Sequence, residues 1–196
     1  MCIRDRWCTH PPRRHFRCSH NVVVACHAAD IPGYLAFREV GFLLDLLAEL
    51  RECAPHHLPE CILVDGNGIL HPNRFGLACH LGVLAGVPTV GVGKSLHHVD
   101  GLSRERVKAL SEGLAARGDH AELVGDSGAV WGALLRTSEP AAGHTASKPV
   151  IVSVGHRVSL DGALALVRRC TRHRIPEPVR QADLGSREWL RKHGAA

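Results

Sequence analysis

The chain has 196 residues, and 24 lysine and arginine residues against 19 aspartate and glutamate residues leave a formal charge of +5 with histidine neutral. Such a length fits one domain, and a hydrophobic content of 45% is enough for one buried core, which excludes a chain that is disordered throughout. Because the sequence has neither a run of about 20 apolar residues nor the apolar stretch of a secretory signal, we expect a soluble intracellular protein.

The positive charge is concentrated at the two ends of the chain. Residues 1–20 hold five arginines and one aspartate, and residues 157–196 hold nine basic and four acidic residues. Residues 21–156 between them carry a charge of −4. This asymmetry suggests an anionic partner such as a nucleic acid along one side, although a solvated charged face is the commoner meaning of such a run.

The beginning of the chain has little regular pattern. Residues 1–21 show no apolar periodicity and are expected to form an irregular arm, after which the β-branched run at 22–25 predicts a short strand. Four cysteines and four histidines are interleaved within residues 2–27 without the C-x-x-C pairs of a zinc site, so a metal-binding arm is a minor alternative. We therefore expect an arm or unrelated N-terminal segment over residues 1–29 and a folded domain over residues 30–196.

From residue 30 onward, helical and strand patterns alternate. Leucines at 43, 46, 47 and 50 lie on one helical face, which predicts a helix over 40–52 that ends near Pro55. Continuous apolar runs at 61–64, 88–92 and 150–154 predict strands buried on both faces. Further helices are expected over 77–84, 104–117, 160–173 and 184–193, and an exposed loop over 137–148. This alternation predicts an α/β fold with parallel strands.

Charged side chains follow the predicted buried strands. Asp65, Lys94 and His156 each come just after such a run, and Glu39 precedes the first helix. Because the carboxyl ends of parallel strands meet at one edge of a sheet, we expect these four groups to converge there. Carboxylate oxygens suit Mg²⁺ or Mn²⁺, and a bound cation can activate water and stabilise charge on a phosphate, as a nuclease requires. The plainer alternative for each residue is a turn-capping aspartate or a loop histidine.

The segment Gly91-Val92-Gly93-Lys94-Ser95 suggests a second kind of phosphate site. Gly-Lys-Ser after a strand resembles the end of a P-loop, which also needs a glycine five residues before the second one. That position is Pro88, whose fixed φ and missing N–H prevent the loop from closing on a phosphate in the usual way. Nucleotide hydrolysis is therefore disfavoured, although Lys94 can still reach an anion at the end of a buried strand.

Five segments of the chain resemble, in order, the motifs of the endonuclease V family. They are residues 31–39 (IPGYLAFRE), 64–72 (VDGNGILHP), 91–94 (GVGK), 153–157 (SVGHR) and 174–183 (RIPEPVRQAD), and the resemblance is closest to vertebrate members. It implies a ribonuclease H-like α/β fold with a mixed sheet flanked by helices. It further implies a Mg²⁺-dependent endonuclease of DNA repair that recognises inosine in DNA and RNA and cuts one nucleotide to its 3′ side.

The resemblance also assigns individual residues. Glu39 and Asp65 would bind the metal, with Lys94 and His156 near the scissile phosphate, so these four are the expected catalytic residues. Glycines allow close backbone approach to an extruded base, and a poorly paired base such as inosine is the easiest to extrude. The residues expected to shape the base pocket are Gly33, Leu35, Gly66, Gly68, His71 and Gly76. Arginines expected to contact backbone phosphates are Arg168, Arg169, Arg172, Arg174 and Arg180.

Two positions depart from the family pattern. Relatives carry a metal-binding aspartate on an early strand, whereas only Asp5 and Asp30 precede Glu39 here, and Asp30 stands where relatives have a wedge tyrosine. We therefore expect a domain without the family's first strands, with residues 1–29 as a replaced N-terminus. The expected partner is inosine-containing RNA or DNA in the cytoplasm or nucleus, the nucleolus included, and no membrane. The alternative function is a catalytically impaired protein that binds inosine-containing nucleic acid.

Overall fold

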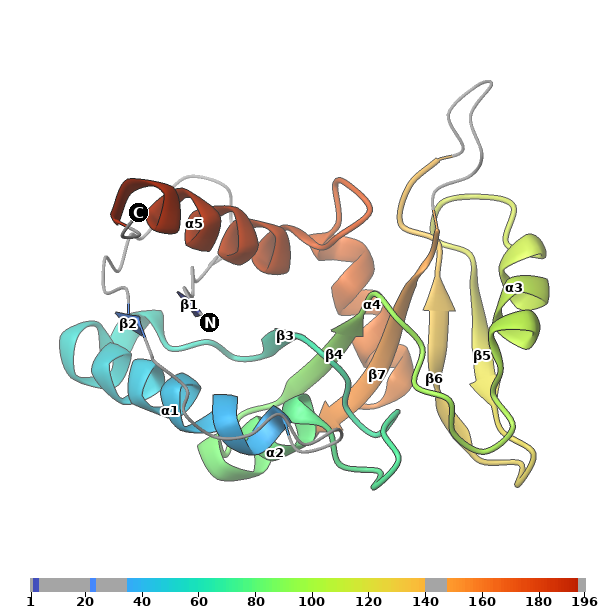
Figure 1. Cartoon of the computed structure of the whole chain (residues 1–196), viewed down its shortest axis with the longest axis horizontal. Helices are drawn as coiled ribbons and strands as arrows, with labels where there is room; N and C mark the ends of the chain where they lie inside the picture. Colours follow the sequence, from blue (N-terminus) through green and yellow to red (C-terminus); the bar gives the residue numbers. More distant parts are fainter. Residues whose placement is uncertain (1, 4–21, 24–34, 140–147, 194–196) are drawn as a thin grey trace.

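The centre of the molecule is a five-stranded sheet with the strand order β3-β4-β7-β6-β5. The computed structural model describes residues 2–3, 22–23, 35–139 and 148–193 (Figure 1). The strands of the sheet are Ile62–Asp65 (β3), Thr89–Gly93 (β4), His120–Val124 (β5), Val130–Leu135 (β6) and Val150–His156 (β7). A separate antiparallel pair consists of Cys2–Ile3 (β1) and Val22–Val23 (β2), the latter within the strand predicted at 22–25.

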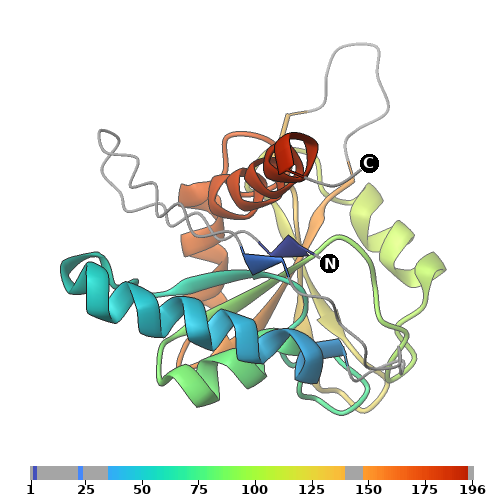
Figure 2. The same cartoon turned by 60° about the vertical axis from the view of Figure 1, so that its left-hand side comes forward.

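Helices cover the sheet from both sides (Figures 1 and 2). Figure 2 shows α1 and α2 together on one side and α5 on the other, while α4 packs against β6 and β7 and α3 against the β5–β6 hairpin. No helix in the described ranges is long and apolar enough to cross a membrane. The helices are Leu35–Cys53 (α1), Leu77–Ala85 (α2), Arg104–Glu112 (α3), Leu160–Cys170 (α4) and Glu177–His193 (α5), with a 3-10 turn at Pro55–His57.

Apolar side chains fill the space between the sheet and these helices. Val90 and Val92 of β4 pack with Leu164 of α4 in one cluster, whereas Ile62 and Val64 of β3 pack with α1 and α2 in another. Every residue of β4 is buried, which accounts for its continuous run of small and apolar residues. Each fully buried valine or leucine contributes about 1.5–3 kcal/mol relative to exposure, so these clusters fix the sheet between its helices.

The strand directions differ from those expected from the alternation of strands and helices. Only β3 and β4 run parallel, whereas β4 and β7, β7 and β6, and β6 and β5 pair antiparallel. The mixed α/β sheet flanked by helices that the family resemblance implied is confirmed, and the all-parallel expectation is wrong. The all-parallel expectation fails because the β5–β6 hairpin precedes β7 in place of a crossover helix, and no strand was predicted for this hairpin. β5 is an edge strand that exposes His120 and Glu122, so its sequence lacks a continuous apolar run.

Several predicted boundaries change for local reasons. The helix expected over 104–117 ends at Glu112, after which Leu114 turns into the core cluster around Leu134. The helix expected over 184–193 begins at Glu177, with Pro178 in its first turn, where proline is well tolerated. Most of the arm at 1–29 and residues 140–147 of the predicted loop lie outside the described residues.

Asp100 ties the segment after β4 to the β5–β6 hairpin. Its carboxylate accepts hydrogen bonds from the Ser127 hydroxyl (2.5 Å), the Ser127 N–H (3.0 Å) and Trp131 Nε1 (2.7 Å). These bonds, the side-chain bond from Ser127 first, lower the pKa of Asp100 below its ordinary value of 3.8. The Arg74 guanidinium lies 4.5 Å from the Trp131 ring. The network orders the turn that leads away from the carboxyl end of β4.

Candidate active site

The carboxyl ends of the two parallel strands bring Asp65 and Lys94 together. Asp65 ends β3 and is registered opposite Val92 of β4, and Lys94 follows β4 directly. Lys94 Nζ lies 2.7 Å from Asp65 Oδ2. The prediction that these two residues meet at one edge of the sheet is confirmed.

This ion pair is partly open to solvent. The Lys94 and Asp65 side chains are 41% and 48% exposed. An ion pair at such exposure contributes only about 0–1 kcal/mol to the free energy of unfolding. Replacing Lys94 beside Asp65 by another cation therefore costs little stability. Asp65 therefore presents a carboxylate that is accessible to a ligand.

A glycine-rich loop continues from Asp65 and packs backbone against backbone on β7. The Gly68 N–H donates to Ser153 Oγ (2.8 Å), and the Ile69 N–H donates to the Val154 carbonyl (2.8 Å). A Cβ on Gly68 would overlap the Val154 carbonyl oxygen and lie 2.5 Å from its carbon. Only glycine fits there without a shift of one backbone segment.

Other glycines let the same loop lie close to β4 and α2. A Cβ on Gly91 would lie 2.5 Å from the Gly68 nitrogen, and one on Gly76 would lie 2.8 Å from the Gly68 carbonyl oxygen. By contrast, the nearest atoms to a Cβ on Gly66 lie at 3.7 Å, an ordinary contact distance. Gly91 and Gly93 are thus strand residues that accommodate the loop, and the next helix after Lys94 begins at Arg104, so this segment is not a P-loop.

His71 belongs to the buried side of this loop. It is 7% exposed, and its Nδ1 accepts a hydrogen bond from the Asn73 N–H (3.3 Å). Its ring centroid lies 5.5 Å from that of the exposed His97. Because His71 Nδ1 accepts this hydrogen bond, it carries no proton, and the proton of the neutral ring is assigned to Nε2. The predicted roles of His71, Gly66, Gly68 and Gly76 toward a base stay predictions.

His156 does not join Asp65 and Lys94, contrary to the expectation that all the strand-end groups converge. β7 is antiparallel to β4, so His156 pairs with Thr89 at the opposite end of β4. Three residues along β4 and two inter-strand spacings separate the His156 and Asp65 positions, about 10 Å in each direction. An extra residue at Gly155 forms a β-bulge next to His156, whose side chain packs beside Gly82 of α2.

The remaining predicted metal and base-pocket residues lie on or before α1. Glu39 is half-buried in α1, and its neighbour Val40 packs against Ile62 and Val64 of β3. Gly33 lies outside the described residues, and of Leu35 the structure describes only its place at the start of α1. Within the described ranges, no group of three or more histidine, cysteine or acidic residues could hold a metal ion.

The basic C-terminal end contributes α5, which packs beside β3. Arg180 Nη1 lies 3.3 Å from Glu177 Oε2, and Asp183 Oδ1 accepts from Arg187 Nε at 3.1 Å. Asp183 thus lies inside α5 and pairs with Arg187. The interpretation that Asp183 orients Arg180 or caps the last helix is wrong.

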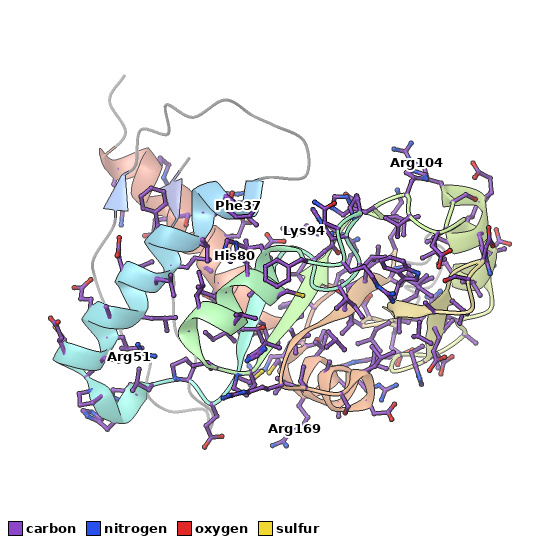
Figure 3. All side chains as sticks on the ribbon, turned by 90° about the horizontal axis from the view of Figure 1, so that it is seen from below. Phe37, Arg51, His80, Lys94, Arg104 and Arg169 are labelled. Atoms are coloured by element: carbon purple, nitrogen blue, oxygen red, sulfur yellow. The ribbon has the colours of Figure 1, made fainter. Side chains whose placement is uncertain are left out.

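An aromatic cluster that the sequence analysis missed adjoins the glycine-rich loop. The Phe37 and Phe75 ring centroids lie 4.7 and 5.6 Å from that of His80. Phe37 is 63% and Phe75 41% exposed, and Figure 3 shows Phe37 above His80 where α1 passes α2. Aromatic faces open to solvent can stack nucleobases. The signal available in the sequence was the presence of these rings inside or next to the recognised motifs.

The cysteine thiols of α2 and of the residue before β3 are poorly suited to act as nucleophiles. Cys79 of α2 is buried, and its Sγ lies 3.7 Å from the Val154 carbonyl oxygen. Burial raises the pKa of the Cys79 thiol, and burial likewise raises the pKa of Cys61 at the start of β3. A thiol held neutral is a poor nucleophile, so hydrolysis at this edge would depend on oxygen and nitrogen groups.

The donor set at this edge is compatible with Mg²⁺. This ion keeps several waters and binds through one or two carboxylates plus substrate phosphates more often than in an all-protein cage. Asp65 supplies one exposed carboxylate, already paired with the Lys94 ammonium, and the role of Glu39 as a second ligand stays a prediction. The described residues therefore fit an ion held largely by water and phosphate and do not form a closed protein site.

Comparisons with known proteins point to one family. A family model described as endonuclease V matches residues 13–184. This match begins inside the arm expected over residues 1–29, and the domain boundary at residue 30 stays a prediction. The chain is 50% identical over 175 residues to endonuclease V of Homo sapiens and 47% identical over 175 residues to that of Mus musculus. Each match covers 87% of this chain, which spans 59% of the human and 49% of the mouse protein.

Solved structures of endonuclease V have the same fold. The catalytic domain of the human enzyme superposes with a TM-score of 0.83 at 49% identity, covering 88% of this chain and 69% of that one. A Ciona intestinalis endonuclease V in complex with a DNA 23mer containing an inosine followed by a ribo-adenosine superposes with a TM-score of 0.76 at 34% identity. That match covers 88% of this chain and 70% of the Ciona chain.

Proposed function

Because this chain belongs to the endonuclease V family of nucleases, we propose that it is a metal-dependent endonuclease acting on inosine-containing nucleic acid. The substrate class is single-stranded RNA or deaminated DNA, and the cut falls one nucleotide to the 3′ side of the inosine. The observation that carries the proposal is the Asp65–Lys94 pair, which two parallel strands hold at one accessible edge of the sheet.

In this proposal Asp65 and Glu39 supply carboxylate oxygens, and Lys94 supplies a mobile positive charge. When bound, Mg²⁺ would supply activation of a water molecule and stabilisation of charge on the phosphate. Displaced from Asp65, the Lys94 ammonium is free to donate to a phosphate oxygen, and loss of so exposed an ion pair costs little. His156 is left out of the group at the scissile phosphate because it lies at the other end of β4.

Base recognition is assigned to the glycine-rich loop and the aromatic cluster. The loop begins at Asp65, so a base held by its backbone would bring the neighbouring phosphate near the carboxylate. Phe37 and Phe75 offer exposed rings for stacking, and the half-buried His80 ring is in contact with both. A Ciona relative has been crystallised with inosine-containing DNA, which supports the same substrate class here. The fold is proposed to be ribonuclease H-like, and the cytoplasmic or nuclear location stays a prediction.

The test uses a 5′-labelled single-stranded RNA with one inosine and the same RNA with adenosine in that position. We expect Mg²⁺-dependent cleavage of the inosine strand alone, stopped by a chelator. Asp65→Asn should slow it by at least about 100-fold. Asp45→Asn, an exposed aspartate of α1, is the matched control and should cleave normally. Equal cleavage by the two variants would contradict the assignment of Asp65.

A second candidate function is inosine-selective binding without cleavage. The observation that favours it is that the described residues provide no group of three metal-binding side chains. In that case the inosine strand should bind more tightly than the adenosine strand in a gel shift, with no product in Mg²⁺ or Mn²⁺. Cleavage that disappears in Asp65→Asn rejects this second function.

A further inference from the structure

Three arginines surround a pocket at the end of β6, away from Asp65. The pocket has a volume of about 200 Å³, well above the roughly 10–15 Å³ that one water molecule needs in the same measure, so a phosphate group has room there. It lies between the end of α4, the end of β6 and the turn before β5. Its lining residues are Arg117, Gly118, Arg136, Thr137, Glu139, Arg168 and Thr171.

Arg136 is the buried charge of this pocket. It is 5% exposed, and its Nε and Nη1 have no hydrogen-bond partner among the described residues. Buried guanidinium N–H groups without a partner are unfavourable, because they have lost water and gained nothing in exchange. An acceptor carrying negative charge in the pocket would satisfy them.

The other two arginines are fixed by backbone carbonyls. Arg117 Nη2 donates to the Thr171 carbonyl (2.5 Å), and Arg168 Nε donates to the Gly118 carbonyl (3.0 Å). Arg168 Nη2 also lies 2.8 Å from His120 Nδ1. These bonds hold both side chains in place and engage only part of the five N–H donors that each guanidinium carries.

The charge balance and donor geometry select the ligand. Among the described residues that line the pocket, Glu139 is the single acidic one, so the three arginines leave an excess of positive charge. Planar guanidinium forks match the paired oxygens of phosphate groups better than a point charge does. We propose that this pocket binds a phosphate group.

The pocket lies at the same edge of the sheet as the candidate active site. Leu135 at the end of β6 pairs with Val150, and Ile151 pairs with Gly93, the residue before Lys94. Two inter-strand spacings, about 10 Å, therefore separate Arg136 from Lys94. One strand crossing this edge would therefore place one phosphate beside Lys94 and another, further along the same strand, in the pocket.

The phosphate can come from two sources. A phosphodiester of the bound strand rests on the proposed function, whereas a free phosphate or phosphate monoester does not. The two are separated by measuring strand binding and inorganic phosphate binding on the same variants. Arg136→Gln removes the buried charge, and Arg168→Gln removes a half-buried one in case the first variant fails to fold. Arg104→Gln is the matched control, because Arg104 projects from the far end of α3 outside the pocket (Figure 3).

Strand binding is measured by fluorescence anisotropy in a chelator, so that no cleavage occurs, over a series of salt concentrations. We expect Arg136→Gln and Arg168→Gln to weaken binding about tenfold, equally for inosine and adenosine strands. The slope of log Kd against log salt should fall by about one. Inorganic phosphate should raise the unfolding temperature of the wild type above that in chloride of equal ionic strength, and this gain should vanish in both variants.

Each result decides the proposal. Weaker strand binding with a smaller salt slope supports a strand phosphate, and loss of only the phosphate-dependent stabilisation supports a free phosphate. If both variants behave like Arg104→Gln in both assays, the proposal is overturned. Failure of the proposed function is recognised separately, because Asp65→Asn changes cleavage while the pocket variants change affinity without changing the preference for inosine.

Discussion

Replacing Gly68 with alanine tests how the glycine-rich loop is held beside Asp65. The added methyl group would overlap the Val154 carbonyl oxygen and lie 3.0 Å from the Gly155 nitrogen. Both neighbours are backbone atoms of β7, which is buried in the centre of the sheet and cannot move without disturbing its pairing with β4 and β6. The loop, and with it the segment after Asp65, must therefore shift.

The magnitude follows from the contacts that the shift affects. Overpacking of this kind costs about 1–3 kcal/mol. Loss of the Gly68 N–H bond to Ser153 Oγ and the Ile69 N–H bond to the Val154 carbonyl adds about 0.5–1.5 kcal/mol each. The smaller backbone entropy of unfolded alanine returns about 0.4–1 kcal/mol. We expect a net loss of about 1–5.5 kcal/mol, a large share of the roughly 5–15 kcal/mol that stabilises a typical domain.

The assay is equilibrium unfolding in urea, followed by circular dichroism and by tryptophan fluorescence. The matched control is Gly66→Ala in the same loop, where the nearest atoms to the new Cβ lie at 3.7 Å. That variant should stay within about 1 kcal/mol of the wild type. If Gly68→Ala proved as stable as Gly66→Ala, the close backbone packing of the loop on β7 would be refuted.

Three further predictions test the core, an acidic network and a helix cap. Leu135→Ala should lower the unfolding free energy by about 2–5 kcal/mol because Leu135 is fully buried, whereas Leu84→Ala at a 54% exposed position should cost far less, both measured in urea. The lowered pKa of Asp100 means that its contribution to stability is complete above its ordinary pKa of 3.8 and is lost as the pH falls through the folded value. Asp100→Asn should therefore show a smaller drop in unfolding temperature than the wild type between about pH 6 and about pH 3, and an equal drop would contradict the network. Ser103→Ala should cost about 1 kcal/mol in thermal unfolding, because the Ser103 side chain caps α3 by accepting from the Arg106 N–H, and an unchanged unfolding temperature would argue against the cap.

Part of the fold and of the site could be predicted because it depends on neighbours in the sequence. The runs 61–64, 88–92 and 150–154 became β3, β4 and β7, since a strand buried on both faces must be apolar along its length. Asp65 and Lys94 follow two of these strands, and because β3 and β4 are parallel neighbours, the two side chains meet. The family motifs indicated the family and the chemistry that we propose for this pair.

The direction of β7 and the contents of the pocket at Arg136 were decided only by tertiary structure. The apolar run at 150–154 predicts burial, yet the same run would be buried in either direction, and the antiparallel choice sends His156 to the far end of β4. Likewise Arg117, Arg136 and Arg168 come from a turn, a strand end and a helix, and no spacing in the sequence relates them. Apolar periodicity records how deeply a segment is buried, whereas the residues that face one another across a site depend on strand order and direction, which the packing of the whole chain sets.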